Sequence, residues 1–279
     1  MQSFTIKDLE NLSGIKAHTI RIWEQRYTFL KPSRTGTNIR YYSNDELKKI
    51  LNVALLNKYG FKISHIDRMN ESEMKERILS LNQLEAQHER VVNSLIQNMV
   101  DLDMDSFEDT LDNFIALRGI EKTILQIIFP YLEKIGILWM TNHIIPAQEH
   151  LVSNIIRQKL IAGIENCSTR VKLNKTVLLY LPEGETHEIS LLFLAFLLKK
   201  RNNRITYLGA NVPLGDVVSV ALHSKPDYTC SIFTTNPTDC LQSYINHLAN
   251  NAPQSNHLFA GQRLANTSID MPTNCTHIK

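Results

Sequence analysis

Apolar and polar positions repeat with different periods along the chain and divide it into three zones. In residues 1–75, short stretches with helical spacing are separated by turns, and one strand-like segment lies near Asn38–Tyr42. Residues 76–165 keep a helical period almost throughout, with no proline before Pro130. A representative apolar stripe of this middle zone consists of Val92, Leu95, Ile96 and Met99. This pattern predicts several amphipathic helices in succession.

Residues 172–279 change to short β-branched and aliphatic runs that alternate with helical stretches. Strands are predicted over residues 176–181, 204–208, 227–234 and 257–260, and helices over residues 188–201, 215–223 and 240–250. Strands that alternate with helices at this rhythm predict a parallel sheet with crossover helices. Ligands of such sheets bind at the carboxyl ends of the strands, so the loops that follow the strands are the places to search for a site.

The net charge of +2 is unevenly distributed over the 279 residues. It is +5 in residues 1–75, −6 in residues 76–165 and +3 in residues 166–279. A basic first zone fits a module that meets a polyanion, followed by zones that need not touch it.

The cysteines and the apolar runs argue for a reduced, cytoplasmic protein. Cys167, Cys230, Cys240 and Cys275 show no spacing typical of metal ligands. The N-terminus has no apolar signal core, and the longest apolar run, Ile189–Leu198, is too short to span a bilayer.

The first zone has the layout of a helix-turn-helix. A helix over residues 5–12 is followed by a tight turn at Ser13-Gly14 and a second helix over residues 16–26. One face of the second helix carries Ile20, Trp23 and Tyr27. Another face carries His18, Arg21 and Gln25. A recognition helix needs such an apolar face on its scaffold and polar side chains that reach base edges in the major groove.

A basic segment with a glycine-bearing turn follows this helix. Residues 31–43 read KPSRTGTNIRYYS, in which basic side chains flank the turn and two tyrosines end the segment. This composition suits a wing that contacts the phosphate backbone. Ser43-Asn44-Asp45-Glu46 then predicts the N-cap of a third helix.

The string TIRIWEQRYTFLKPSRTGTNIRYYSNDEL resembles the MerR family of regulators, because turn, recognition helix, wing and next helix match in order. The resemblance implies that Arg21, Arg34, Arg40 and Tyr41 contact DNA, with His18 and Thr19 near bases or phosphates. It implies that Glu24 holds the module together. The long dimerising helix that often follows this module is not evident in residues 76–100, so we expect dimerisation to depend on the rest of the chain.

The first strand of the parallel sheet ends in the loop PEGETHEIS, residues 182–190. His187 lies two residues after Glu185, and a carboxylate beside an imidazole can fix its tautomer and raise its basicity as a metal ligand. The loop resembles the Asp/Glu-x-His-x-x-Gly loop of cobalamin-binding domains. That resemblance makes His187 the lower axial ligand of cobalt and Glu185 its partner, and the cofactor is expected to be adenosylcobalamin.

A second element is Trp139, followed after nine residues by Glu149-His150. Asn142 and Pro146 predict that one helix ends and another begins between them. The pattern resembles the helical bundle that caps cobalamin in the light- and cobalamin-responsive repressors of the MerR family. The resemblance implies that Trp139 covers the upper face of the cofactor and that Glu149 and His150 help to hold it.

Several positions depart from the cobalamin-binding pattern. Ser190 replaces the glycine of the histidine loop, and Ser231-Ile-Phe233 and Ala260-Gly261 match only half of the Ser-x-Leu and Gly-Gly elements that line the slot for the nucleotide tail. Ser231 and Gly261 are the matching halves. Met140 stands where light-sensing members have a histidine, with His143 nearby as a substitute. The bis-histidine state of photochemical switching is therefore not expected.

The predicted fold class is multidomain, α plus α/β. It comprises a winged helix-turn-helix over residues 1–75, a four-helix bundle cap over residues 76–168 and a Rossmann-like, cobalamin-binding type of parallel sheet over residues 169–279. The functional hypothesis is a DNA-binding repressor, not an enzyme, whose homo-oligomerisation on a double-stranded operator is controlled by cobalamin. Two alternatives remain open: a regulator whose degenerate, cofactor-free sensor only oligomerises or binds a protein, and a cobalamin-dependent enzyme, for which no stretch is long enough to form a catalytic barrel.

Overall fold

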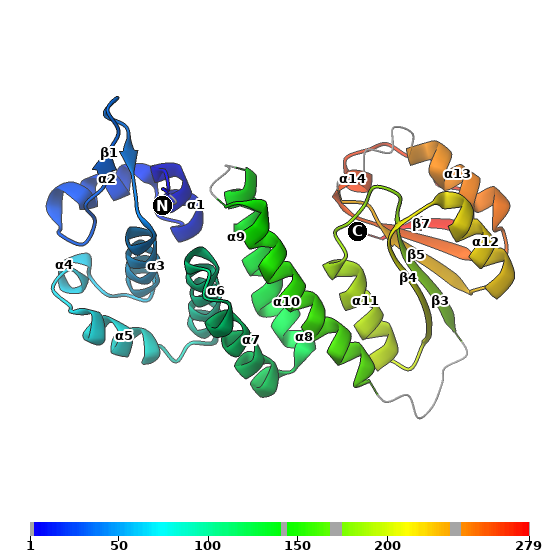
Figure 1. Cartoon of the computed structure of the whole chain (residues 1–279), viewed down its shortest axis with the longest axis horizontal. Coiled ribbons are helices and arrows are strands. Elements are labelled where there is room, and N and C mark those ends of the chain that lie inside the picture. The colour runs from blue at the N-terminus through cyan, green and yellow to red at the C-terminus, as the bar shows by residue number, and fades with distance from the viewer. Residues whose placement is uncertain (1–2, 141–143, 168–174, 235–240, 279) are drawn as a thin grey trace. The chain divides into compact units, whose positions relative to one another are not determined.

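The computed structural model (Figure 1) describes residues 3–140, 144–167, 175–234 and 241–278. It comprises two compact units, Met1–Ile155 and Ile156–Lys279. The division into three domains stays a prediction, and its boundary at residue 75 falls inside the helix α5 (Glu71–Leu79). Within the described ranges, no helix has both the length and the apolar character needed to cross a membrane.

The first unit opens with two helices, α1 (Ile6–Ser13) and α2 (Ala17–Arg26), joined by a tight turn. Thr5 and Asp8 cap α1 reciprocally, and the backbone N–H of Thr5 donates to the Asp8 carboxylate at 2.7 Å. Gly14 ends α1 with φ +73°, in the left-handed region that glycine adopts without steric cost. These local signals direct the chain from α1 into α2, as the sequence predicts.

An antiparallel pair of short strands follows, β1 (Ser33–Arg34) and β2 (Arg40–Tyr41), and forms the wing. Ser43 caps the next helix, α3 (Asn44–Lys58), and confirms the predicted N-cap. Two shorter helices, α4 (Ile63–Ile66) and α5, complete this part. Its buried core includes Leu9, Ile20, Trp23, Leu47 and Ile50.

Long helices make up the rest of the first unit. They are α6 (Leu84–Asp101), α7 (Met104–Arg118), the segment of α8 (Ile120–Thr123), π-helix η1 (Ile124–Ile128) and α9 (Phe129–Met140), and the beginning of α10 (Pro146–Glu165). The predicted stripe of α6 is buried, and the rings of Phe107 and Tyr131 meet edge to face at 5.6 Å between centroids. The helical character of the middle zone is thus confirmed.

Polar contacts join the helix-turn-helix to these long helices. The Lys134 ammonium on α9 donates to the backbone carbonyl of Leu12 at 3.1 Å, near the C-terminal end of α1, where the helix dipole favours a cation. Burial lowers the pKa of Lys134 below its usual value. Lys48 on α3 forms an ion pair with Asp101 on α6. Both groups of helices therefore belong to the same compact unit.

The second unit contains a five-stranded parallel sheet with the order β4-β3-β5-β6-β7. Its strands are β3 (Thr176–Pro182), β4 (Arg204–Val212), β5 (Tyr228–Ile232), β6 (Asn256–Ala260) and β7 (Cys275–His277). The sequence pattern predicts the first four and misses β7, which has only three residues. The strand order reverses between β3 and β5, and this switch point is where ligands of doubly wound sheets bind.

Helices cover both faces of the sheet, and the sheet separates two cores. One core lies between the sheet and α12 (Leu214–Ser224), α13 (Leu241–Asn251) and the short α14 (Gln262–Ala265). The other core lies between the sheet and α11 (Ile189–Lys200), with Ile164 of α10 packed against it. The predicted α/β alternation is confirmed, and β3, whose residues after Thr176 are all buried, lies between β4 and β5.

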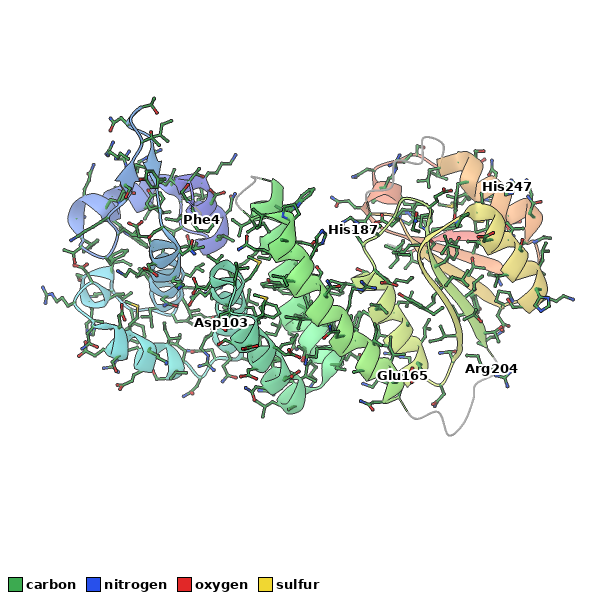
Figure 2. All side chains as sticks on the ribbon, viewed as in Figure 1. Phe4, Asp103, Glu165, His187, Arg204 and His247 are labelled. Carbon is green, nitrogen blue, oxygen red and sulfur yellow. The ribbon has the colours of Figure 1, made fainter. Side chains whose placement is uncertain are left out.

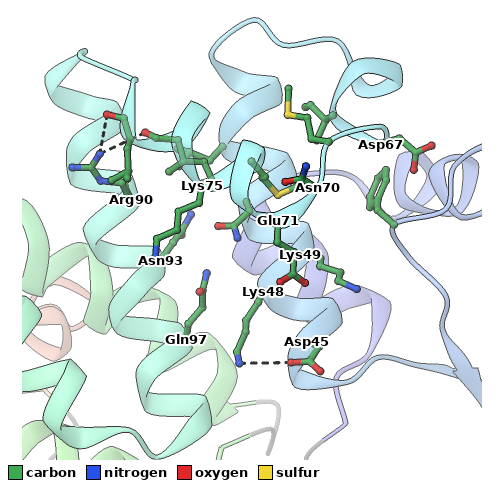
Figure 3. A pocket seen from close by; sticks show the side chains of 18 of the residues that line it. Asp45, Lys48, Lys49, Asp67, Asn70, Glu71, Lys75, Arg90, Asn93 and Gln97 are labelled. Carbon is green, nitrogen blue, oxygen red and sulfur yellow. Dashed lines mark hydrogen bonds and ion pairs between the residues drawn. The ribbon is translucent and has the colours of Figure 1, made fainter.

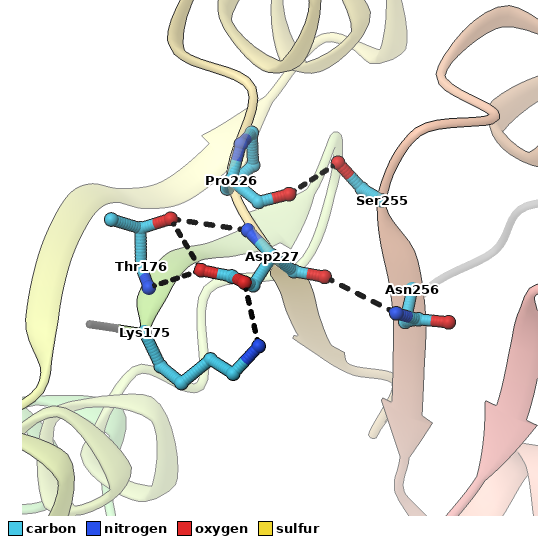
Figure 4. Close-up of polar contacts among 6 residues, drawn as sticks. All are labelled: Lys175, Thr176, Pro226, Asp227, Ser255 and Asn256. Carbon is cyan, nitrogen blue, oxygen red and sulfur yellow. Dashed lines mark hydrogen bonds and ion pairs between the residues drawn. The ribbon is translucent and has the colours of Figure 1, made fainter. Parts of the chain in front are cut away.

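The amino ends of the strands are held by a polar network around Asp227 (Figure 4). Its carboxylate accepts from the backbone N–H and the hydroxyl of Thr176, and it pairs with Lys175 at 2.8 Å. The Lys175 ammonium and the Thr176 donors hold the pKa of Asp227 at about 2. Ser255 donates to the carbonyl of Pro226 at 2.7 Å and ties β6 to the same edge. This edge stabilises the sheet and leaves the opposite, carboxyl edge for a ligand.

Candidate nucleic-acid and cofactor sites

The outward face of α2 presents the residues that were predicted to reach DNA. His18 and Arg21 are exposed, Thr19 is half-buried, and Ile20 and Trp23 on the opposite face are buried. The amphipathic division predicted for a recognition helix is therefore present. Gln25, on the same outward face, is also exposed.

The wing presents its own basic and aromatic side chains. Arg34 and Tyr41 are exposed, and the Arg34 guanidinium donates to the Asn38 side-chain oxygen at 2.7 Å. Asn38 adopts φ +68°, a conformation that asparagine tolerates better than most residues, and so closes the wing turn. The contact between Arg34 and Asn38 stiffens the wing around this turn.

Glu24 connects the wing to the recognition helix. Its side chain is only 7% exposed, accepts from the Arg40 guanidinium at 3.0 Å and also accepts from the Tyr42 hydroxyl. Burial, reinforced by Glu24, raises the pKa of Tyr42 well above its usual value. The backbone of Tyr42 pairs in turn with that of Phe4. The expected role of Glu24 in holding the module together is confirmed, and Arg40 is anchored by it.

The carboxyl edge of the sheet holds the predicted histidine and its carboxylate. Glu185 is completely buried, and its Oε1 accepts from His187 Nδ1 at 2.6 Å and from the backbone N–H groups of Thr186 and His187. Its Oε2 accepts from the backbone N–H of Thr234, just beyond β5, at 2.8 Å. One carboxylate therefore spans the switch point between β3 and β5 and orients the imidazole above it.

The His187 side chain is 58% exposed in the loop between β3 and α11, where Figure 2 labels it. Because Nδ1 faces Glu185, Nε2 is the nitrogen that would bind a metal. The backbone N–H of Gly184 donates to the Asn211 side chain at 2.8 Å, which ties the loop to the end of β4. Ser190 is exposed in the first turn of α11. A rigid loop with an accessible imidazole is suited to ligate a metal that arrives within a cofactor.

Next to this loop, Glu188 is part of a chain of charged and phenolic groups. It accepts from the Tyr207 hydroxyl at 2.8 Å and pairs with Arg157 at 2.6 Å. Sequence reasoning missed this network because Arg157, Glu188 and Tyr207 are far apart in the chain. It fixes the start of α11 beside the histidine.

Ser231 and Gly261 lie in the same unit as His187, in β5 and directly after β6. Ser231 is almost fully buried in β5, opposite Tyr180 of β3. Gly261 has φ +116°, and a Cβ atom there would lie 2.2 Å from the carbonyl oxygen of Phe233. Glycine is therefore required at position 261, because the backbone of Phe233 approaches too closely for a side chain. Both residues contact a packed aromatic core rather than an open slot.

The first unit carries the second set of predicted cofactor residues. Trp139 is at the end of α9, and Glu149 and His150 are in the first turn of α10, as expected. Trp139 is 55% exposed, so it is not a core residue, and the His150 ring contacts the Glu149 carboxylate at 2.9 Å. His143 lies outside the described residues, as does the side chain of Met140.

A hollow of about 940 Å³ in the first unit is lined by α3, α5 and α6 (Figure 3). Its labelled side chains mix both charges, with Lys48, Lys49, Lys75 and Arg90 beside Asp45, Asp67 and Glu71. None of the predicted DNA or cofactor residues lines it. It is therefore separate from both candidate sites.

Two family descriptions match this chain. Residues 4–73 match the MerR HTH family regulatory protein, and residues 91–162, which span most of α6 to α10, match the B12 binding domain. The chain combines a MerR-type DNA-binding domain with a B12 binding domain. The MerR-type domain covers the helix-turn-helix and its wing, and the B12 binding domain covers Trp139, Glu149 and His150.

Two transcriptional repressors are similar to most of this chain. The chain is 27% identical over 230 residues to the HTH-type transcriptional repressor CarA of Myxococcus xanthus, covering 82% of this chain and 75% of the relative. It is 28% identical over 234 residues to the repressor CarH of the same organism, covering 81% of this chain and 77% of the relative.

A solved structure shares the fold. The monomethylamine corrinoid protein of Methanosarcina barkeri matches with a TM-score of 0.50 and 12% identity, covering 68% of this chain and 93% of the other. At this identity the match shows only that the bundle and the parallel sheet follow a known architecture.

Proposed function

We propose that this protein is a transcriptional repressor that binds operator DNA through its MerR-type domain and is controlled by a cobalamin bound through His187. The observation that carries the proposal is the buried Glu185, which holds an exposed imidazole at the switch point of a parallel sheet. A B12 binding domain and a MerR-type domain in the same chain support it.

The DNA half of the proposal rests on α2 and the wing. Arg21 and His18 reach base edges in the major groove, with Thr19 at the backbone, while Arg34, Arg40 and Tyr41 contact phosphates. Glu24 accepts from one side of the Arg40 guanidinium, whose remaining N–H groups are still available to a phosphate oxygen. The proposed partner is the double-stranded operator, and the proposed location is the cytoplasm.

Arg21 and Arg40 give the sharpest test of this half. Arg21→Ala should weaken operator binding and reduce the preference for the operator over unrelated DNA by about 1–3 kcal/mol, because a base contact is lost. Arg40→Ala should weaken binding to all sequences alike and lower the salt slope by about one, because a phosphate contact is lost. Band-shift titrations at several salt concentrations measure both, and equal effects of the two changes on unrelated DNA would refute the assignment.

The cofactor half rests on the fit of the donor set. Imidazole is a common ligand for cobalt and related metals, and Glu185 supplies the carboxylate that sets its tautomer. When bound, cobalamin would supply a cobalt centre that the His187 Nε2 could ligate. The exposed Trp139, with Glu149 and His150, is proposed to cover the upper face, and adenosylcobalamin is the proposed form. Ser190 is proposed to lie beside the corrin, with Ser231 and Gly261 in the sheet beneath it.

Control of DNA binding is proposed to work through self-association. Gathering several MerR-type domains on one operator raises avidity by orders of magnitude without new contact types. The bound cofactor would stabilise the homo-oligomer, and its removal or alteration would release the DNA. No catalytic step is proposed for this chain.

The test is a spectrum of the purified chain after mixing with adenosylcobalamin and desalting, with and without illumination, beside a mass measurement. Retained colour supports the proposal. His187→Ala should remove the spectral signature of protein ligation, and in the cobalt(II) state the nitrogen hyperfine splitting from ¹⁵N-labelled histidine should disappear. His247→Ala, an exposed histidine on α13 (Figure 2), is the matched control and should leave both unchanged.

A second candidate is a regulator whose sensor has lost the cofactor and serves only oligomerisation or a protein partner. The observation that favours it is the filled aromatic core around Ser231, where the resemblance places the nucleotide slot. This candidate would be supported by a protein that is colourless after desalting and whose oligomeric mass is the same with and without adenosylcobalamin.

A further inference from the structure

Three hydroxyl groups converge beneath the carboxyl ends of β3 and β5. Tyr180 and Ser231 are register partners on these strands, and Tyr244 on α13 lies across from them; the Tyr180 hydroxyl is close enough to both to interact with them. All three hydroxyls are buried, and among the described residues none has a partner at hydrogen-bonding geometry. These three hydroxyls are therefore enclosed within the second unit and do not reach its surface.

Aromatic rings fill the remaining space at this place. The Phe233 ring meets Tyr244 at 5.6 Å and Phe259 at 6.0 Å between centroids, both edge to face. Tyr180, Phe233 and Phe259 are completely buried. A side chain with no exposed surface has no water-sized space beside it, whereas a nucleotide base needs a cavity many times larger.

The backbone closes the same place from the side of β6. Phe233 donates its N–H to the carbonyl of Ala260 at 2.8 Å, and Arg263 donates its N–H to the Phe233 carbonyl at 3.4 Å. Gly261 packs so closely on Phe233 that not even a methyl group would fit. The two half-matched elements, Ser231-Ile-Phe233 and Ala260-Gly261, are therefore bonded to each other rather than held apart.

We infer that this chain binds its corrinoid through His187 without seating the nucleotide tail in the sheet, because Tyr180 and Phe233 occupy that place. The inference rests on the proposed cofactor function. Ligation of cobalt uses only the exposed imidazole, which lies outside the closed core. The tail carries an anionic phosphodiester, which is best solvated in water. The ligand class is then a corrinoid of any lower base, including cobinamides, which lack the tail.

The test compares aquocobalamin with diaquocobinamide in absorbance titrations of the full wild-type chain. Cobinamide should bind at least as tightly as cobalamin, because it has no tail base on cobalt that His187 must displace. Cobalamin that binds at least about tenfold more tightly than cobinamide would overturn the inference while leaving the proposed function standing. If neither corrinoid binds, the proposed function fails, and the inference fails with it.

Tyr180→Ala tests the residue that closes the place. It should favour cobalamin over cobinamide by about tenfold relative to wild type, because an opened aromatic-lined space can bury the lower base. Leu179→Ala is the matched control, since Leu179 is the neighbouring residue of β3 in the core on the opposite face of the sheet. Circular dichroism checks that both variants fold. An unchanged preference in folded Tyr180→Ala would overturn the role of Tyr180.

The ³¹P resonance of the bound cofactor gives an independent readout that needs no variant. A tail that stays in solvent should keep nearly the chemical shift and the narrow line of the free phosphodiester, while a corrin held by His187 tumbles with the protein. A broadened and shifted resonance would place the tail inside the protein and overturn the inference.

Discussion

Glu24 and Glu185 each orient a functional side chain with a carboxylate, but the two carboxylates accept from different kinds of donor. Glu24 sits on the recognition helix and binds side chains of the wing, Arg40 and Tyr42. Glu185 sits on a loop and binds the His187 side chain together with backbone N–H groups, one of them 49 residues away at Thr234. The first carboxylate joins side chains, and the second joins strands of a sheet.

The difference teaches where each site is vulnerable. Glu24 contacts the side chains of Arg40 and Tyr42, so its interactions join side chains of the wing to the recognition helix. Glu185 instead accepts from backbone N–H groups as well as from His187, so the main chain holds its carboxylate in place. Loss of the Glu24 carboxylate should therefore weaken the binding of DNA. Loss of the Glu185 carboxylate should instead unfold the loop that carries His187.

The largest expected effect is that of Glu185→Ala. It removes a fully buried carboxylate that accepts from His187 and from the backbone N–H groups of Thr186, His187 and Thr234, so we expect the sheet unit to lose about 3 kcal/mol of unfolding free energy. Hydrogen exchange resolved along the chain measures this, and β3 and β5 should lose protection first. Glu183→Ala, exposed in the same loop, is the control. Full protection in Glu185→Ala would show that the carboxylate does not tie the strands together.

A smaller effect is expected for Glu24→Gln. The change removes the charge but keeps the size, so the module should lose about 1.5–2 kcal/mol, the cost of a charged hydrogen-bonding partner. Trp23, on the same helix, reports this unfolding by fluorescence. Operator affinity should fall as well, because Arg40 is no longer held. Operator affinity is measured under conditions in which the variant is fully folded. If the variant is less stable but binds the operator as tightly as wild type, Arg40 is not positioned by Glu24.

The smallest expected effect is a pH dependence of the unfolding free energy that comes from His257. His257 is buried, bonded to Thr229 at 2.8 Å, and burial lowers its pKa below the usual value of about 6.5. His257 therefore binds a proton more readily in the unfolded chain than in the folded one. The contribution of His257 to stability is complete above about pH 6.5 and decreases as the pH falls below that value.

Denaturant titrations at pH 7.5 and pH 5.5 measure this dependence, which should stay below about 1.4 kcal/mol for this one group. In His257→Gln the same comparison should show a smaller slope. A slope equal to that of wild type would assign the pH dependence to other groups.

The DNA module was predictable almost in full because its signals are local. The caps at Thr5 and Ser43 and the turn at Gly14 act over a few residues, and the apolar face of α2 repeats within one helix. The alternation of strands and helices was equally visible. The strand β7 was missed because three residues carry no readable period. The anchoring of the module by Lys134 was not predicted, because its acceptor is the backbone of Leu12, which has no side-chain signature.

The candidate sensor divides along the same line. The pairing of Glu185 with His187 follows from a spacing of two residues, and the sequence alone determined it. Whether a tail fits beside Ser231 depends on which way Tyr180 and Phe233 point. Central strands of a parallel sheet are apolar on both faces, so their pattern carries no sign of which side chain fills which core. Only the folded chain, in which β3, β5 and α13 meet, decided that the place is filled.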